Sequence, residues 1–119
     1  MSKFMVNLTA INPFDKQRST PPIEVIVDTG AEDSWLPRKA LESAGITPQR
    51  KRSYMTADKR IIERDTGYAL LTAEGFTALE EVVFAEDSDL SLLGVHTIEG
   101  FHVMVDNIAQ RFVATIPTV

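Results

Sequence analysis

The stretch IEVIVDTGAEDSWLP, residues 23–37, indicates how this chain folds. It begins with a β-branched, apolar run that is typical of a buried strand and that leads directly into Asp28, Thr29 and Gly30. An aspartate at this point leaves the strand in a tight loop, so we expect its carboxylate to be held at the protein interior. Thr29 can hydrogen-bond neighbouring backbone, and Gly30 lets backbone approach the carboxylate closely. Asp28 is therefore the strongest candidate for acid–base chemistry.

Outside this stretch, apolar and polar residues mostly alternate with a period of two, which favours half-buried strands. Strands are predicted over residues 3–10, 23–27, 76–86 and 90–93, with a long hairpin over 53–73 and a final hairpin over 101–116. Residues 12–22 contain three prolines and indicate a loop. Short helices are predicted at 37–45 and before Gly100. About seven strands and one or two short helices indicate a mainly β fold, a closed or nearly closed β-barrel, with residues 1–119 forming one domain.

Composition excludes several classes of protein. The chain has no cysteine, which excludes disulfides and thiolate metal sites, and its net charge of −5 argues against general nucleic-acid binding. No apolar run approaches the ~18 residues of a membrane helix, and no signal-peptide core is visible, so we expect a cytoplasmic protein without a membrane partner. His96 and His102 have no third ligand at a metal spacing, and we expect neither metal nor cofactor. The basic cluster QRKR, residues 49–52, is interpreted as a solvated loop.

Asp-Thr-Gly occurs a second time, at residues 65–67, in a different context. Charged residues precede this copy, so we expect Gly67 to mark a bend or bulge between two strands, and Asp65 to be exposed and paired with Arg64 or Lys59. A two-lobed enzyme with one aspartate in each lobe fails on spacing, because only 37 residues separate positions 28 and 65.

One carboxylate is a poor catalyst for amide hydrolysis, which needs a base to deprotonate water and an acid to protonate the carbonyl or the leaving nitrogen. Two neighbouring carboxylates that share one proton can do both, since close like charges push their two titrations apart. The chain offers only one good candidate, Asp28. Two possibilities remain open at this point: the protein has no such pair, or it forms one by pairing with a second copy of itself.

Two motifs, IEVIVDTGAEDSWLP and, about 65 residues downstream, LSLLGVHTIEGFHVMVD, resemble the retropepsin-type aspartic proteases, and their small single-domain prokaryotic members above all. The resemblance covers roughly residues 23–112 and implies the acid-protease fold. It also implies that Asp28 is the catalytic aspartate and meets Asp28 of a second subunit, that Thr29 bonds across the two-fold axis, and that Gly30 presents its carbonyl to bound peptide.

The same resemblance assigns further roles. The residues that contact substrate would be Ala31, Glu32 and Asp33 in the active loop and Thr56, Ala57, Asp58 and Lys59 at the tip of a closing hairpin, the flap. Residues 92–94 would form a second loop under the first, and strands over 3–8 and 112–116 would form the dimer sheet. Two departures from the family pattern stand out: the tip, TADKR, lacks the usual glycine, and Glu32 is longer than the aspartate often found there.

Three other features receive plainer interpretations. Trp35 is interpreted as a core residue rather than as part of a substrate pocket, Asp106 as a hairpin-turn residue, and the acidic run AEDSD, residues 85–89, as a solvated loop.

The sequence thus predicts a homodimeric aspartic endopeptidase that acts on a peptide or protein substrate. The alternative is a dimer with the protease fold but little or no activity that acts as a peptide-binding or assembly module, for which the unusual hairpin tip is the motive. An unrelated small β-barrel that carries the motif by chance is the third possibility.

Overall fold

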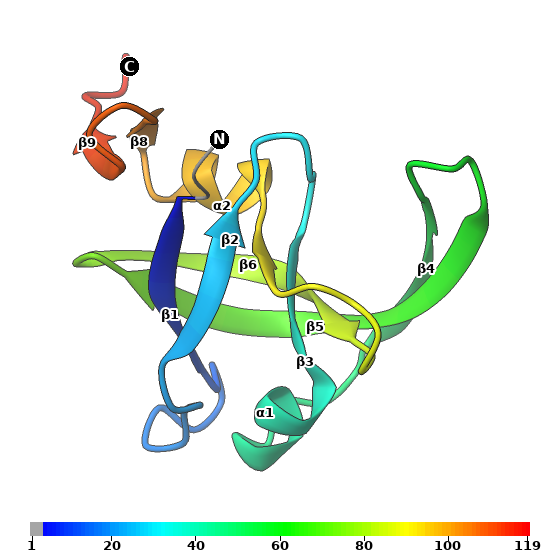
Figure 1. Cartoon of the computed structure of the whole chain (residues 1–119). Helices are drawn as coiled ribbons and strands as arrows, with labels where there is room; N and C mark the ends of the chain where they lie inside the picture. Colours follow the sequence, from blue (N-terminus) through cyan, green and yellow to red (C-terminus); the bar gives the residue numbers. More distant parts are fainter. Residues whose placement is uncertain (1–3) are drawn as a thin grey trace.

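A computed structural model describes residues 4–119, whose strands and short helices are shown in Figure 1. The strands are β1 (Met5–Ile11), β2 (Ile23–Val27), β3 (Ser34–Pro37), β4 (Arg50–Met55), β5 (Ile61–Ala73), β6 (Phe76–Ala85), β7 (Leu92–Leu93), β8 (Val103–Asp106) and β9 (Arg111–Ala114). The helices are α1 (Arg38–Ser43) and α2 (Val95–Gly100). The prediction of a mainly β fold with two short helices is confirmed. The first residue of the predicted strand over 3–10, Lys3, lies outside the described part of the chain.

Seven of these strands form one sheet in the order β1-β2-β7-β3-β6-β5-β4. The sheet closes on itself because β1 pairs with β2 through residues 5–8 and with β5 through residues 9–11. The result is a closed ring of hydrogen-bonded strands, which agrees with the closed or nearly closed arrangement predicted from the sequence. The other two strands, β8 and β9, form a separate hairpin at one end of the ring (Figure 1).

The interior of the ring is apolar, as the alternation of the strands predicts. Phe4, directly before β1, and Val6 and Leu8 within β1 are buried, while Met5 and Asn7 between them are exposed. Large side chains that are fully buried come from every part of the ring: Leu8, Val25, Leu36, Leu71, Phe84 and Leu93. Burial of this apolar surface is the main stabilising contribution to the fold.

A cluster of four phenylalanines joins the β8–β9 hairpin to the ring. Phe112 of β9 lies 5.5 Å from Phe4, 6.2 Å from Phe76 and 6.1 Å from Phe101, measured between ring centroids. These tilted and edge-on contacts are the geometry that aromatic pairs prefer. The cluster therefore fixes the last hairpin against β1, β6 and the end of α2.

Both helices lie where the sequence predicts them. Pro37 immediately precedes α1, and Gly45 follows it with φ +73°, a left-handed conformation that ends helices and favours glycine. In α2, Thr97 and Ile98 are buried, and Gly100 is the last helical residue rather than the residue after the end. Neither helix is long and apolar enough to cross a membrane, among residues 4–119.

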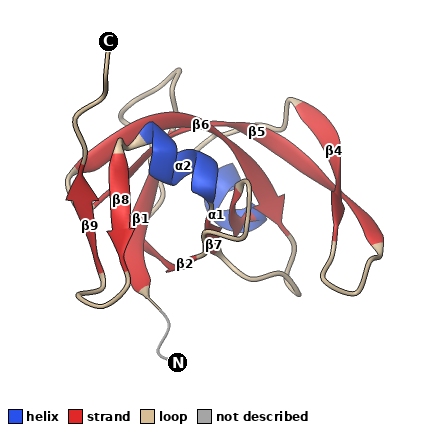
Figure 2. Ribbon diagram, turned by 90° about the horizontal axis from the view of Figure 1, so that it is seen from above, coloured by secondary structure: helices blue, strands red, loops and turns tan. Residues whose placement is uncertain are grey.

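The hairpin of β4 and the first half of β5 extends away from the ring, on the opposite side of the molecule from β8 and β9 (Figures 1 and 2). The second half of β5 returns to the ring, where it pairs with both β1 and β6. One long strand thus belongs to the ring and to the projecting hairpin. The hairpin's position is therefore set by where β5 leaves the ring.

The prediction of a bend or bulge at the second Asp-Thr-Gly is wrong. Asp65, Thr66 and Gly67 lie inside the continuous strand β5 and pair in unbroken register with β4 or β6. A Cβ atom on Gly67 would lie 2.6 Å from the carbonyl oxygen of Thr47, so a glycine is needed because another segment of backbone crosses closely.

The expected environment of Asp65 is also wrong. Its side chain is only 20% exposed, and it binds Arg38 at 2.7 Å and Lys51 at 2.9 Å rather than Arg64 or Lys59. These two cations, Lys51 above all, lower the pKa of Asp65. Asp65 is thus held as an ionised structural group.

Candidate active site

The loop that begins at Asp28, here called the active loop (residues 28–33), is held from below by β7. Strands β2 and β7 run parallel, with Val27 beside Leu93, and the backbone N–H of Asp28 donates to the carbonyl of Leu93 at 2.9 Å. Within the loop, the N–H of Gly30 donates to Oδ1 of Asp28 at 2.9 Å, and the N–H of Ala31 donates to the Asp28 carbonyl at 3.1 Å. The carboxylate therefore has a defined orientation.

The start of α2 supports the other half of the active loop. The N–H of Val95 donates to the carbonyl of Ala31 at 2.8 Å, and the N–H of His96 donates to the carbonyl of Glu32 at 3.0 Å. A Cβ atom on Gly94 would lie 2.4 Å from the carbonyl oxygen of Asp33, so only glycine allows this close packing. The position expected for residues 92–94, under the active loop, agrees with these contacts.

The tripeptide itself is more open than the sequence predicts. Asp28 is half-buried, and Thr29 and Gly30 are exposed. The expectation that the Asp28 carboxylate is buried in the protein interior is therefore wrong for a single copy of the chain. The reason is that β7 and α2 cover the loop from one side only, and within residues 4–119 the other side faces solvent.

A groove of about 840 Å³ runs past Asp28. Its wall comes from the active loop, from the inner side of the β4–β5 hairpin and from the loop that precedes β7. Of the predicted site residues, the groove is lined by Asp28, Gly30, Ala31, Glu32, Asp33, Thr56 and Ala57, but not by Thr29, Asp58 or Lys59. The hairpin tip thus contributes only its first two predicted residues to the groove.

Trp35 lines this groove together with Leu90, Leu92 and Ile62. Its ring is half-buried and meets the ring of Tyr54 edge-on, with centroids 5.1 Å apart. The interpretation of Trp35 as a core residue is therefore wrong. A strand residue can face the ring's interior or the groove, and which of these it faces depends on how β3 is inserted between β6 and β7.

Asp33 is buried, with 4% of its side chain exposed, and both of its carboxylate oxygens are occupied. Oδ2 accepts hydrogen bonds from the hydroxyl of Tyr54 at 2.7 Å and from Nη1 of Arg52 at 3.2 Å. Oδ1 lies 3.1 Å from Nδ1 of His96. The pKa of Tyr54 is raised, first by burial and then by its hydrogen bond to this carboxylate. Asp33 borders the groove but its oxygens bind protein groups.

Sequence reasoning missed Arg52, Tyr54 and His96 as members of this site. The alternation along β4 gives a signal for two of them, because Arg52 and Tyr54 are two residues apart and share a face. Nothing in the local sequence indicates that this face meets Asp33.

Residues 49–51 are exposed, as expected, but the interpretation of residues 49–52 as a loop is wrong, since Arg50, Lys51 and Arg52 lie in β4 and each forms an ion pair. Arg50 binds both carboxylate oxygens of Glu81, at 2.6 and 2.7 Å. This pairing, with a hydrogen bond from Thr66, lowers the pKa of Glu81 to about 2. The cluster thus joins β4 to the ring.

In the acidic run at 85–89, residues 86–88 are exposed and outside the strands, as the interpretation of a solvated loop expects, but Ala85 ends β6 and Asp89 is half-buried. Arg64 binds both carboxylate oxygens of Asp89, at 2.8 and 3.0 Å, and the two side chains are 18% and 14% exposed. This bidentate pair fixes the loop before β7 to the β5 arm of the hairpin.

The interpretation of Asp106 as a hairpin-turn residue is confirmed, because its Oδ1 accepts hydrogen bonds from the N–H groups of Ile108 and Ala109 in the β8–β9 turn.

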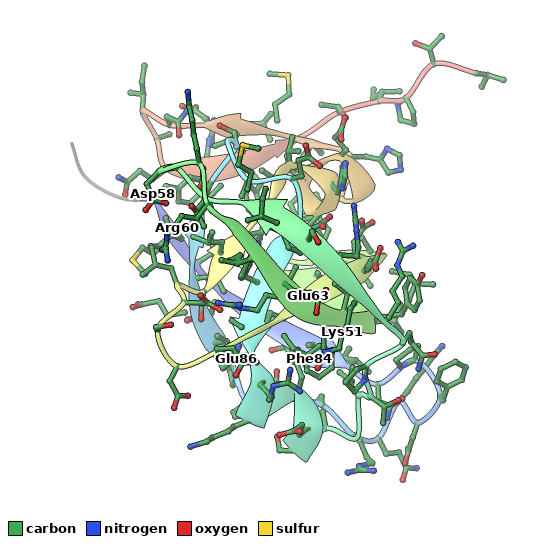
Figure 3. The ribbon with its side chains drawn as sticks, turned by 90° about the vertical axis from the view of Figure 1, so that its right-hand side faces the viewer. Lys51, Asp58, Arg60, Glu63, Phe84 and Glu86 are labelled. Atoms are coloured by element: carbon green, nitrogen blue, oxygen red, sulfur yellow. The ribbon has the colours of Figure 1, made fainter. Side chains whose placement is uncertain are left out.

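The hairpin tip is closed by its own residues. Thr56 exchanges backbone hydrogen bonds with Arg60 and Lys59, its hydroxyl donates to Asp58, and Asp58 pairs with Arg60 at 2.9 Å. Figure 3 shows Asp58 and Arg60 close together at this tip and apart from Glu86. Lys59 adopts φ +65°, the left-handed conformation that a glycine supplies more easily. A polar turn therefore replaces a glycine turn.

The chain matches the family model of the aspartyl proteases over residues 17–97. The match covers the active loop, the β4–β5 hairpin, β7 and the start of α2, and it ends before β8. No curated protein matches the chain. The matched segment is more than half of the chain and contains the Asp28 loop with the strand and helix that support it. The chain belongs to the aspartyl protease family.

Proposed function

We propose that the protein is a homodimeric aspartic endopeptidase of the retropepsin type, related to the small prokaryotic members. The observation that carries the proposal is the Asp28 carboxylate, which is oriented by the N–H of Gly30 and lies at the edge of a groove large enough for an extended peptide. Membership of the aspartyl protease family supports the same chemistry.

The second carboxylate that the chemistry requires is assigned to Asp28 of another copy. Two of the other acids along the groove, Asp33 and Asp89, are already bound to Arg52 and Arg64. Glu32 is exposed, and we assign it to contacts with substrate. The exposure of Thr29 and Gly30 supports this assignment, because a partner loop can approach them directly.

The surface proposed for the dimer lies at the end of the molecule that carries the active loop. The start of β1, the β8–β9 hairpin and the C-terminal residues lie at this same end (Figure 1). The end carries apolar side chains exposed in one chain: Met5 at 40%, Met104 at 61%, Val113 at 36% and Ile116 at 95%. Covering them in a dimer contributes favourable burial of apolar surface.

In the proposed mechanism, a water molecule is held between the two Asp28 carboxylates. The ionised carboxylate removes a proton from the water as it attacks the scissile carbonyl, while the protonated one hydrogen-bonds the carbonyl oxygen. The tetrahedral gem-diol collapses as the leaving nitrogen is protonated. Substrate lies extended beneath the hairpin and pairs with it through backbone hydrogen bonds.

A second candidate function is a peptide-binding or assembly module that keeps the fold and the dimer. The observation that favours it is the hairpin tip, which is closed by Thr56, Asp58 and Arg60 and has no glycine. A turn closed in this way changes its own backbone conformation less readily around a substrate than a glycine turn does.

The deciding experiment compares Asp28→Asn with the wild type against a diverse peptide library, from acid to neutral pH. The enzyme proposal expects cleavage by the wild type, inhibition by a statine-type mimic of the gem-diol, and no cleavage by Asp28→Asn. Binding of peptides without cleavage by the wild type favours the second candidate. Sedimentation that shows only monomer at working concentrations contradicts both.

A further inference from the structure

The buried carboxylate of Asp33 joins three parts of the molecule that are far apart in the sequence. Arg52 and Tyr54 reach it from β4, and His96 reaches it from α2. The guanidinium of Arg52 also lies 5.6 Å from the centre of the Tyr54 ring, and its Nη1 donates to both Asp33 and Glu81. We call Asp33, Arg52, Tyr54 and His96 the Asp33 cluster. Its contacts tie the base of the projecting hairpin to the active loop.

The hairpin is also fastened on its other arm. Arg64 of β5 binds Asp89 in the loop before β7 through two hydrogen bonds. Tyr54, which ends the attached part of β4, pairs with Ile62 across the hairpin, and beyond it Met55 pairs with Ile61. The hydrogen bonds and ion pairs found for residues 55–61 of the described chain lie within the hairpin itself. The hairpin therefore has a fastened base and, within the described residues, a tip whose hydrogen bonds and ion pairs all lie inside the hairpin.

We propose that Asp33 is a positioning residue that fastens the β4 arm over the groove, so that only the segment beyond Tyr54 moves when substrate enters. This inference rests on the proposed peptidase function for its effect on turnover, but its structural part stands independently. A carboxylate with three protein donors has little capacity left for substrate. Substrate selection by charge in the active loop therefore falls to Glu32, which is exposed and forms no ion pair within residues 4–119.

The first test uses fluorescence and does not depend on activity. Trp35 is the only tryptophan of the chain, and its ring contacts Tyr54. Releasing the β4 arm moves Tyr54 away and opens Trp35 to solvent. Acrylamide quenching of Trp35 is therefore expected to increase, with a red shift of its emission, in both Tyr54→Phe and Asp33→Asn.

Two matched controls accompany these variants. Tyr68→Phe removes the hydroxyl of an exposed tyrosine on β5, and Asp87→Asn neutralises an exposed aspartate that forms no ion pair among residues 4–119. Both are expected to leave the quenching of Trp35 unchanged. Tyr54→Phe keeps the ring and the carboxylate, so it tests the fastening even if Asp33→Asn does not fold, which circular dichroism checks. Wild-type quenching in both Tyr54→Phe and a folded Asp33→Asn would overturn the proposal.

The second test measures peptide cleavage. Because each variant removes a hydrogen bond to a charged group, KM is expected to rise about tenfold in either variant, with kcat changed much less. The double variant is expected to be no worse than the single ones, since both break the same contact. If Asp33 instead contacted substrate, Asp33→Asn would act only on peptides with a basic side chain, Tyr54→Phe would not reproduce it, and the effects would add. An inactive wild type with the expected quenching changes contradicts the proposed function but leaves the fastening intact.

Discussion

Asp28-Thr29-Gly30 and Asp65-Thr66-Gly67 have the same three residues, but the first forms a loop at the end of β2 and the second lies inside β5. In the loop, Oδ1 of Asp28 is bound by the N–H of Gly30, and Thr29 and Gly30 are exposed. In the strand, Asp65 is bound to two cations, and Thr66 and Gly67 are buried. The comparison shows that a short motif gains its chemistry from what surrounds it.

The physical reason is which groups surround each of the two carboxylates. Asp65 is held ionised by Arg38 and Lys51, which makes it a poor proton carrier. Asp28 has no cation bound to it among residues 4–119, which leaves its carboxylate available for the pairing with a second Asp28 proposed above. Four predictions sharpen this contrast.

The largest difference in peptide cleavage is expected between variants of the two aspartates. Asp28→Asn removes the proposed base and is expected to lower kcat/KM by a factor on the order of 10³ or more. Asp65→Asn disturbs two ion pairs outside the groove, with Arg38 and Lys51, and is expected to leave kcat/KM within a factor of about 3. Peptide cleavage, assayed well below the melting temperature of both variants, checks this. Equal loss in the two variants would contradict the separation of roles.

The two glycines are expected to differ in the property they affect. Gly67→Ala places a Cβ atom 2.6 Å from the carbonyl oxygen of Thr47 and is expected to lower the free energy of unfolding by about 1–3 kcal/mol. Gly30→Ala places one 3.2 Å from Oδ1 of Asp28, so it is expected to cost less stability but to lower kcat by a factor of about 10–100 through displacement of the carboxylate. Urea unfolding and steady-state kinetics on both variants separate these effects, and the reverse pattern would refute the comparison.

The groups around the second Asp-Thr-Gly are expected to make the free energy of unfolding depend on pH in the acid range. Glu81, which accepts a hydrogen bond from Thr66, has its pKa lowered from 4.5 to about 2. Because the unfolded chain binds this proton more readily, the stabilisation is complete above pH 4.5, falls as the pH falls towards 2, and is absent below that. Its size is about 1–2 kcal/mol, since half-exposed Arg50 is screened by water.

Urea unfolding of Glu81→Gln across this pH range tests the prediction. The variant is expected to lose stability near neutral pH and to vary less with pH than the wild type. Glu24→Gln, at an exposed strand residue without an ion pair in the described chain, is the control and is expected to follow the wild type. A wild-type pH dependence in Glu81→Gln would show that other carboxylates cause the acid sensitivity.

The smallest effect is expected at the two threonines. Thr66→Val removes the hydroxyl that donates to Glu81 at 2.6 Å and is expected to lower the free energy of unfolding by about 1 kcal/mol. Thr29→Val is expected to change the stability of one chain by less than about 0.5 kcal/mol, because Thr29 is exposed. Under the dimer proposal, Thr29→Val weakens association, which sedimentation measures, whereas Thr66→Val does not. Equal sedimentation of Thr29→Val and the wild type would argue against a role for Thr29 between subunits.

The sequence by itself was enough to predict most of the strands, both helices and the hairpin that projects from the ring, but it missed β3 and the first half of β4. Alternation with a period of two identified the inward residues of β1, and Pro37 with Gly45 bounded α1. These signals are local, because pleating and helix ends depend on residues a few positions apart. The choice of Asp28 over Asp65 also rested on local context, namely the apolar strand before it.

Tertiary structure alone decided which groups meet. Trp35 turned to the groove, Asp33 was buried among Arg52, Tyr54 and His96, and Asp65 met Arg38 from α1. These partners are 19 to 63 residues apart in the sequence, and they meet because of the register of β4 on β5 and the insertion of β3 and β7 into one sheet. Local patterns carry no information about such crossings, since a strand face looks the same whether it meets solvent, core or a buried carboxylate. The sequence therefore indicated which residue can do chemistry, and the closure of the ring decided what surrounds it.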